Sequence, residues 1–142
     1  MIRAFREYDL DAIMQIWLDT NLKTHSFISE KYWTDNYATV KEVLPQAEVY
    51  VHEDDDTHQI MGFIGLTGNY IAGIFIKETA QSNGIGKQLL SYVKKIKTNL
   101  SLKVYQKNVR AISFYQRERF LIKTESIDDS TNEKEFVMNW NK

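Results

Sequence analysis

The sequence predicts an α+β fold, in which a mixed, mostly antiparallel sheet carries helices on both faces. The first third of the chain repeats apolar residues at helical spacing, whereas the middle third consists of short apolar runs separated by turns. The last third joins a strand, a glycine-containing loop, a helix and another strand, an order that produces a right-handed crossover between parallel strands.

A short strand is expected over residues 2–5, and two helices follow it. From Asp9 to about Leu22 the apolar residues recur at helical spacing, with Asp9 in place for an N-cap. Ser29 is placed to cap a second helix, which Pro45 ends.

Three short apolar runs in the middle of the chain predict three antiparallel strands, over residues 47–53, 59–68 and 69–78. The polar stretch "DDDTH" and the pair Gly68-Asn69 supply the turns between them. The acidic tip from Glu53 to Asp56 is interpreted as a solvated hairpin loop, with recruitment of a basic partner as the alternative.

An apolar stripe after the glycines predicts a helix over residues 85–96. The remaining elements are a strand, a helix and two strands, over residues 100–106, 108–118, 120–126 and 133–140. The strand that ends near Lys77 and the strand that begins near Leu100 should run parallel. The final strand alternates like a sheet edge that could pair across a homodimer, and a monomer is equally compatible.

Length and composition fit one globular domain over residues 1–142. Because the chain has no cysteine, disulfides, thiolate metal sites and a cysteine nucleophile are excluded. No apolar run approaches the roughly 20 residues that cross a bilayer, and the N-terminus lacks a signal-peptide core. We therefore expect no membrane partner and a cytoplasmic protein.

The net charge of -1 gives no global argument for nucleic-acid binding. The basic residues are nevertheless unevenly distributed, since nine of the eighteen lie between Gln81 and Phe120 and only one of the nineteen acids, Glu118, lies there. A solvated helix face explains this run as well as a binding site for a small polyanion does.

Gly84 and Gly86 stand where the predicted helix begins, and the free N–H groups of a helix start form an anion site. Two nucleotide motifs fail here. A P-loop would need Gly in place of Gln81 and Ser or Thr in place of Gln88, and a dinucleotide fingerprint would need Gly in place of Leu89. The sequence therefore supports neither ATP nor NAD.

The pattern that does fit is Gln-x-x-Gly-x-Gly, after an apolar strand and before an amphipathic helix. Here the chain resembles the GNAT superfamily of acyl-CoA N-acyltransferases, and the element order extends the resemblance over nearly the whole chain. It implies a GNAT-like sheet whose central parallel strand pair is splayed around acetyl-CoA, with the loop amides around the pyrophosphate. The expected contacts of this loop come from Gln81, Ser82, Asn83, Gly84, Ile85, Gly86 and Lys87, and those of the preceding strand from the backbone of Ile74, Phe75 and Ile76.

Further site residues follow from the segment "VYQKNVRAISFYQRERF". The resemblance implies that Asn108 contacts the pantetheine arm and that Tyr115 lies near the cofactor sulfur, although a helix cap and a packed tyrosine are the ordinary interpretations. Arg119 departs from the family, where glycine is common at this turn. If the turn is left-handed, a residue other than glycine costs about 1 kcal/mol there.

The resemblance implies direct attack of a neutral primary amine on the thioester in a ternary complex. Tyr115 is the hypothetical proton donor to the leaving thiolate. The base is left open between His25, Glu78 and a relayed water, and His25 is favoured as a residue of the substrate pocket or a cap.

The stretch "HSFI" resembles a small bacterial YiaC-like branch of the family that is linked with protein lysine acetylation. The acceptor is therefore expected to be a lysine or N-terminal amine of a protein or peptide. Small-molecule amines and a non-catalytic CoA-binding module are the alternatives. An aromatic set on the two N-terminal helices fits core packing or an amine-binding wall, and consists of Trp17, Tyr32, Trp33 and Tyr37.

Overall fold

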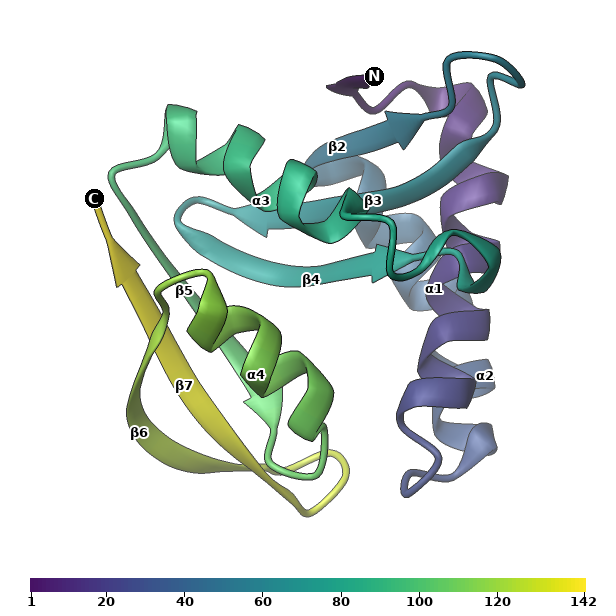
Figure 1. Ribbon diagram of the computed structural model, residues 1–142. Coiled ribbons are helices and arrows are strands. Elements are labelled where there is room, and N and C mark those ends of the chain that lie inside the picture. The colour runs from purple at the N-terminus through teal and green to yellow at the C-terminus, as the bar shows by residue number, and fades with distance from the viewer.

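The computed structural model describes residues 1–142 and confirms the predicted α+β class (Figure 1). Seven strands form one sheet in the order β1-β2-β3-β4-β5-β7-β6, and every neighbouring pair is antiparallel except β4 and β5. The final strand, β7, is not the predicted sheet edge, because it pairs with β5 on one side and β6 on the other. The strands are β1 (Ile2–Ala4), β2 (Glu48–Glu53), β3 (Ile60–Thr67), β4 (Tyr70–Ile76), β5 (Asn99–Tyr105), β6 (Leu121–Asp128) and β7 (Glu133–Asn141).

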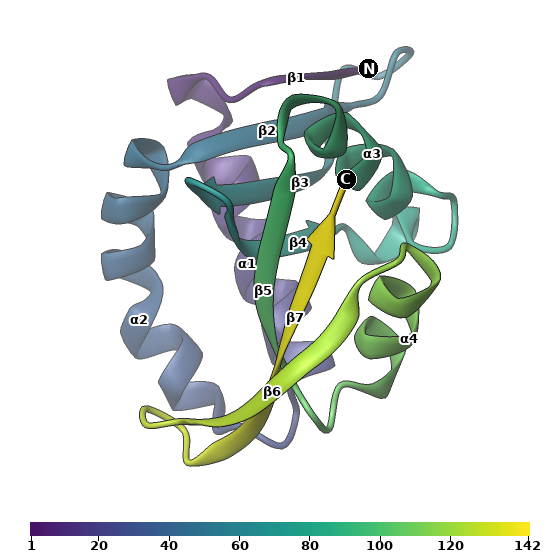
Figure 2. The same ribbon diagram turned by 90° about the vertical axis from the view of Figure 1, so that its left-hand side faces the viewer.

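Four α-helices cover the two faces of the sheet (Figures 1 and 2). They are α1 (Leu10–Thr24), α2 (Glu30–Val43), α3 (Ile85–Ile96) and α4 (Val109–Arg117). One hydrophobic core lies between the sheet and α1 with α2, around Phe63 and Met14, and a second lies between the sheet and α3 with α4, around Leu89 and Phe120. No helix is both long and apolar enough to span a bilayer.

The local signals for α2 and for the β2–β3 turn act as the sequence predicts. The Ser29 hydroxyl accepts a hydrogen bond from the Lys31 amide at 3.2 Å, and α2 ends at Val43 before Pro45. In the acidic hairpin turn, the carboxylate of Asp54 accepts hydrogen bonds from the amide and the hydroxyl of Thr57. This turn is therefore held by its own side chains.

The prediction that Asp9 caps α1 is wrong, because its carboxylate makes no capping hydrogen bond to that helix. It accepts a hydrogen bond from the Arg6 amide at 2.8 Å, which closes the short 3-10 turn Glu7–Asp9, and two more from the Arg3 guanidinium at 2.8 and 2.9 Å. Burial raises the pKa of this carboxyl, but the bonds to Arg3 and Arg6 outweigh it and hold the pKa below its ordinary value. Arg3 on β1 thus binds the Asp9 carboxylate that the local sequence predicts to cap the helix.

Arg119 adopts a left-handed conformation, with φ of +72°. An L-residue costs about 1 kcal/mol in this conformation relative to glycine. The turn forms all the same: the Arg119 amide donates to the carbonyl of Gln116 at 3.1 Å, and the chain enters β6.

Candidate active site

The central strands β4 and β5 separate after a short pairing. Only Tyr70↔Ser101 and Ile71↔Leu102 are paired, although β4 continues to Ile76 and β5 to Tyr105. Over Gly73–Ile76, β4 bonds to β3 on one side and leaves the backbone groups of its other edge without a strand partner. A free strand edge of this kind can pair with the amide groups of an extended ligand.

A cavity of about 590 Å³ lies at this separation. It is lined by every residue expected to contact the cofactor except Asn83, and by both expected catalytic residues: Ile74, Phe75, Ile76, Gln81, Ser82, Gly84, Ile85, Gly86, Lys87, Asn108, Tyr115 and His25. The structure thus brings together residues from β4, α3, α4 and the end of α1. Asn83 belongs to the same loop but does not line the cavity.

The glycine loop presents the start of α3 to this cavity. Gly84 is the N-cap of α3 with φ of +79°, a conformation that favours glycine. A Cβ on Gly84 would meet no atom within 4 Å, and one on Gly86 would lie 3.5 Å from the Phe114 ring. The Gln81 amide fastens the loop to the end of β4 by donating to the carbonyl of Ile76 at 3.1 Å. The loop therefore offers free amides and open space.

Three residues of the basic run line the same cavity, namely Lys87, Arg110 and Arg117, while Glu118 is its one acidic lining residue. The Arg110 guanidinium donates to the Ser82 hydroxyl at 3.2 Å, so it lies over the glycine loop. Cations beside a helix start favour an anionic ligand, and phosphates above all. This arrangement favours the polyanion interpretation of the basic run for these three residues.

Tyr115 lies on α4 and is 9% exposed. Burial raises the pKa of its phenol above the ordinary value, so the hydroxyl keeps its proton at neutral pH. The ring packs on Phe114 and Phe120, as the ordinary interpretation expects, and the residue also lines the cavity. A protonated phenol in such a place can act as a proton donor.

His25 ends α1 and lies half-buried between two amide side chains. Its Nδ1 is 2.9 Å from Oδ1 of Asn21, and its Nε2 is 3.2 Å from Nδ2 of Asn108. Burial lowers the pKa of His25 to about 4, which leaves the ring neutral at physiological pH. Asn108 also caps α4, since its Oδ1 accepts from the Ala111 amide at 3.2 Å. Asn21 carries no motif, and sequence reasoning misses it.

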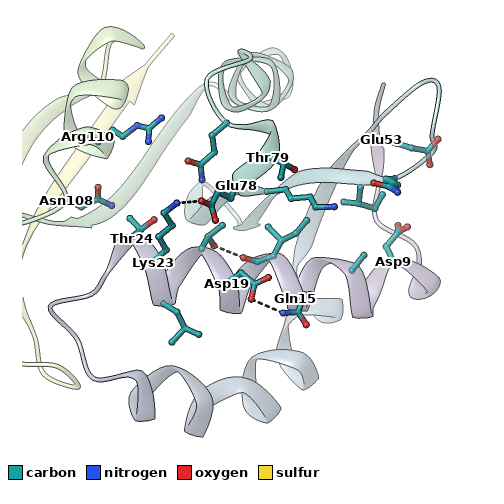
Figure 3. A pocket seen from close by; sticks show the side chains of 18 of the residues that line it. Asp9, Gln15, Asp19, Lys23, Thr24, Glu53, Glu78, Thr79, Asn108 and Arg110 are labelled. Atoms are coloured by element: carbon teal, nitrogen blue, oxygen red, sulfur yellow. Dashed lines mark hydrogen bonds and ion pairs between the residues drawn. The ribbon is translucent and has the colours of Figure 1, made fainter.

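A larger groove of about 1460 Å³ adjoins the cavity along α1 (Figure 3). The two hollows share lining residues, namely Thr20, Thr24, Gln81, Asn108 and Arg110. Glu78, a candidate base, lies in this groove and forms an exposed ion pair with Lys23. Glu78 therefore lies beside the cavity that Tyr115 lines, but it does not line that cavity itself.

Aromatic and acidic side chains meet on the α1–α2 side of the sheet. Trp17 and Trp33 are core residues in edge-to-face contact at 5.8 Å between ring centroids, as core packing predicts. The Tyr105 hydroxyl donates to Asp128 at 2.6 Å. Burial and the charge of Asp128 raise the pKa of the half-buried Glu135. The cluster of Tyr105, Asp128 and Glu135 is not predicted from the sequence, because its members lie on β5, β6 and β7 and meet only in the folded sheet.

The chain is similar to proteins of a known family in both sequence and fold. Residues 10–119 match the acetyltransferase (GNAT) family. The chain is 36% identical over 142 residues to the peptidyl-lysine N-acetyltransferase YiaC of Escherichia coli (strain K12), across 99% of this chain and 96% of that protein. It is 30% identical over 129 residues to the peptidyl-lysine N-acetyltransferase YjaB of Salmonella typhimurium, across 90% of this chain and 88% of that protein.

A solved structure agrees with the observed architecture. The solution structure of apo-form YjaB from Escherichia coli superposes with a TM-score of 0.87 and 25% sequence identity, and it covers 99% of this chain and 96% of that one.

Proposed function

This chain belongs to the acetyltransferase (GNAT) family, and we propose that it forms one catalytic domain over residues 1–142 that moves the acetyl group of acetyl-CoA to a lysine side chain of a protein or peptide. The observation that carries the proposal is the shared cavity, in which the free edge of β4, the glycine loop and Tyr115 meet. Two relatives that carry the name peptidyl-lysine N-acetyltransferase support lysine as the acceptor.

The cavity fits acetyl-CoA in its open space, its charge and its free backbone groups. The backbone of Ile74–Ile76 would pair with the pantetheine amides, while the amides after Gly84 would hold the pyrophosphate together with Lys87, Arg110 and Arg117. Bound there, acetyl-CoA supplies an activated thioester. Membership of the family implies direct attack of the amine on the thioester, and the sequence agrees, because without cysteine no cysteine acyl-enzyme can form.

Tyr115 would give its proton to the departing sulfur as the new amide bond forms and the carbon–sulfur bond breaks. Its raised pKa keeps that proton available at neutral pH. General acid assistance of this kind contributes about 10²- to 10⁴-fold in rate. Glu78 has no contact with Tyr115, and its pairing with Lys23 favours a role at the rim over one as the base.

The attacking amine must be neutral, and an unperturbed lysine with a pKa near 10.4 is neutral in only roughly one molecule in a few thousand at pH 7. The substrate nevertheless arrives as a cation. Asp128 and Glu135, with Tyr32, Tyr70 and Tyr105 beside them, provide negative charge and aromatic faces that attract such a cation. Burial and the neighbouring charges of Glu135 and Asp128 raise the pKa of Tyr70, which places its ring beside this surface.

The acceptor is tested by thiol release from acetyl-CoA with an N-terminally blocked peptide that contains one lysine. The same peptide with arginine at that position is the matched control, and polyamines, aminoglycosides and free amino acids complete the panel. Among these compounds, we expect only the lysine peptide to cause thiol release. Mass spectrometry should then show a single acetyl group on its lysine Nζ. Faster release with small amines, or release that needs an unblocked peptide N-terminus, would contradict the lysine assignment.

A further inference from the structure

An unbroken series of hydrogen bonds connects α1 with α4 at the cavity. Asn21, on the last turns of α1, is 3% exposed and contacts His25, which in turn contacts Asn108 at the start of α4. All three side chains line the cavity. The series therefore joins a helix on one face of the sheet to the helix on the other face that carries Tyr115.

The backbone fixes the direction of each bond in this series. Nδ2 of Asn21 donates to the carbonyl of Trp17 at 2.9 Å, so Oδ1 of Asn21 is the atom that faces His25 and must accept. At the other end, Oδ1 of Asn108 accepts from the Ala111 amide, so its Nδ2 faces His25 and must donate. His25 thus carries its proton on Nδ1 and accepts at Nε2.

This tautomer leaves no free lone pair on His25. Nδ1 holds the proton, and the lone pair of Nε2 already accepts the hydrogen bond of Asn108. The ring is also enclosed by Phe27, Trp33 and Tyr105, with centroids 5.1 to 5.7 Å away. A base needs a lone pair directed at the amine, and His25 directs its own at an amide of the chain.

We propose that Asn21 and His25 are positioning residues, in which Asn21 selects the tautomer of His25 and His25 holds the amide of Asn108 and the start of α4 in place at the cavity. The wrong tautomer would turn Nε2–H toward the N–H group of Asn108. Asn108 would then lose either its bond to His25 or its cap on α4. The expected consequence for acetyl-CoA rests on the proposed function, because that function assigns the cavity to the donor.

The charges around His25 make its ionisation easy to interpret. No carboxylate or ammonium group contacts the ring, and burial is the cause of its low pKa. The charged groups on the elements packed around it have partners of their own: Lys23 on α1 with Glu78, Lys31 on α2 with Asp35, Lys107 before α4 with Glu133, Arg110 on α4 with Ser82, and Asp128 on β6 with Tyr105, whose ring packs against His25. A new charge at position 21 would therefore dominate.

Two substitutions separate positioning from packing. Asn21→Leu removes the acceptor that selects the tautomer, and we expect a dissociation constant for acetyl-CoA about five- to tenfold higher at every pH. Asn21→Asp keeps the acceptor, so it should bind within about twofold of wild type at pH 8. The carboxylate raises the pKa of His25, however, and protonation removes the Nε2 lone pair. The ratio of the two dissociation constants, variant to wild type, should therefore rise as the pH falls from 8 to 6.

The matched control is Asn36→Leu on α2. Asn36 also donates to a carbonyl one turn back, that of Tyr32, but it lines neither hollow. Calorimetric titration should give wild-type acetyl-CoA affinity for this variant, even if its melting temperature falls. Equal affinities for Asn21→Leu and Asn36→Leu, or a pH-independent Asn21→Asp ratio, would overturn the proposal.

The tautomer itself is measured without ligand, by long-range ¹H–¹⁵N NMR of the histidine rings. We expect the Nδ1–H form for His25 in the wild-type protein and loss of that form in Asn21→Leu. An Nε2–H ring in the wild type would overturn the proposal even if the enzyme acetylates lysine. Conversely, if no amine promotes thiol release, the proposed function fails while the ring signals and the acetyl-CoA titrations still decide the positioning role.

Discussion

Tyr115 has two properties that are difficult to combine, namely burial and an available hydroxyl. Phe114 and Phe120 pack against its ring. Burial raises the pKa of the phenol and keeps it protonated, and no hydrogen bond from the chain contributes to this shift. Tyr115 nevertheless lines the cavity, where a bound ligand has room to form a hydrogen bond with its hydroxyl.

Replacing Tyr115 with phenylalanine removes this hydroxyl and keeps the packing. We expect kcat for acetyl transfer to fall about 10²-fold or more, because the leaving thiolate loses its proton donor. The dissociation constant for acetyl-CoA should stay close to the wild-type value. Steady-state kinetics and calorimetry measure the two quantities.

Tyr92→Phe serves as the control for this substitution. Tyr92 packs against the same core from α3 and contacts Tyr50 at 5.0 Å between ring centroids, but it does not line the cavity. Its loss of a hydroxyl should leave kcat unchanged. An unchanged kcat in Tyr115→Phe would remove Tyr115 from the mechanism.

The start of α3 separates two roles that glycine can play. Gly84 needs its positive φ of +79°, whereas Gly86 is an ordinary helical residue whose missing side chain leaves space at the cavity. The first glycine is thus required by the backbone conformation. The second is required only if a ligand approaches the backbone closely.

Substitution of each glycine by alanine tells these roles apart. Gly86→Ala should keep or raise the free energy of unfolding, by up to about 1 kcal/mol, because alanine is the better helix former. It should still weaken acetyl-CoA binding, since the new Cβ would occupy space in the cavity wall 3.5 Å from the Phe114 ring. Gly84→Ala should lose about 1 kcal/mol of stability at its left-handed position. Denaturant melts and calorimetry check both, and wild-type affinity in Gly86→Ala would exclude a close approach at that residue.

The whole molecule consists of two sheet halves joined by a short parallel contact. Strands β1 to β4 with α1, α2 and α3 form one half, and β5 to β7 with α4 form the other (Figure 2). Only two residue pairs connect β4 with β5. This geometry places backbone groups, cations and a phenol from separate parts of the chain around one cavity.

Much of this architecture is predictable from sequence, because it follows from local patterns. The apolar periodicity predicts the helices and strands, and the strand, glycine loop and helix predict the parallel pair. Asp9 shows where local reasoning fails, since Arg3 takes its carboxylate into a tertiary network. The role of Asn21 cannot be predicted for a similar reason. Its hydrogen-bond series runs through His25 to Asn108, which is distant in sequence, and no residue near Asn21 indicates that contact.

We propose that acetyl-CoA binds where β4 and β5 separate. Titration of ¹⁵N-labelled protein with acetyl-CoA, with ATP and NADH as control ligands, tests it residue by residue through the backbone amide signals. We expect acetyl-CoA to shift the amide signals of Gly73–Ile76, of the loop from Ser82 to Lys87 and of Asn108, and the control ligands to leave the β4 amide signals in place. Saturable shifts confined to other surfaces, or no shifts at all, would show that acetyl-CoA does not bind where β4 and β5 separate.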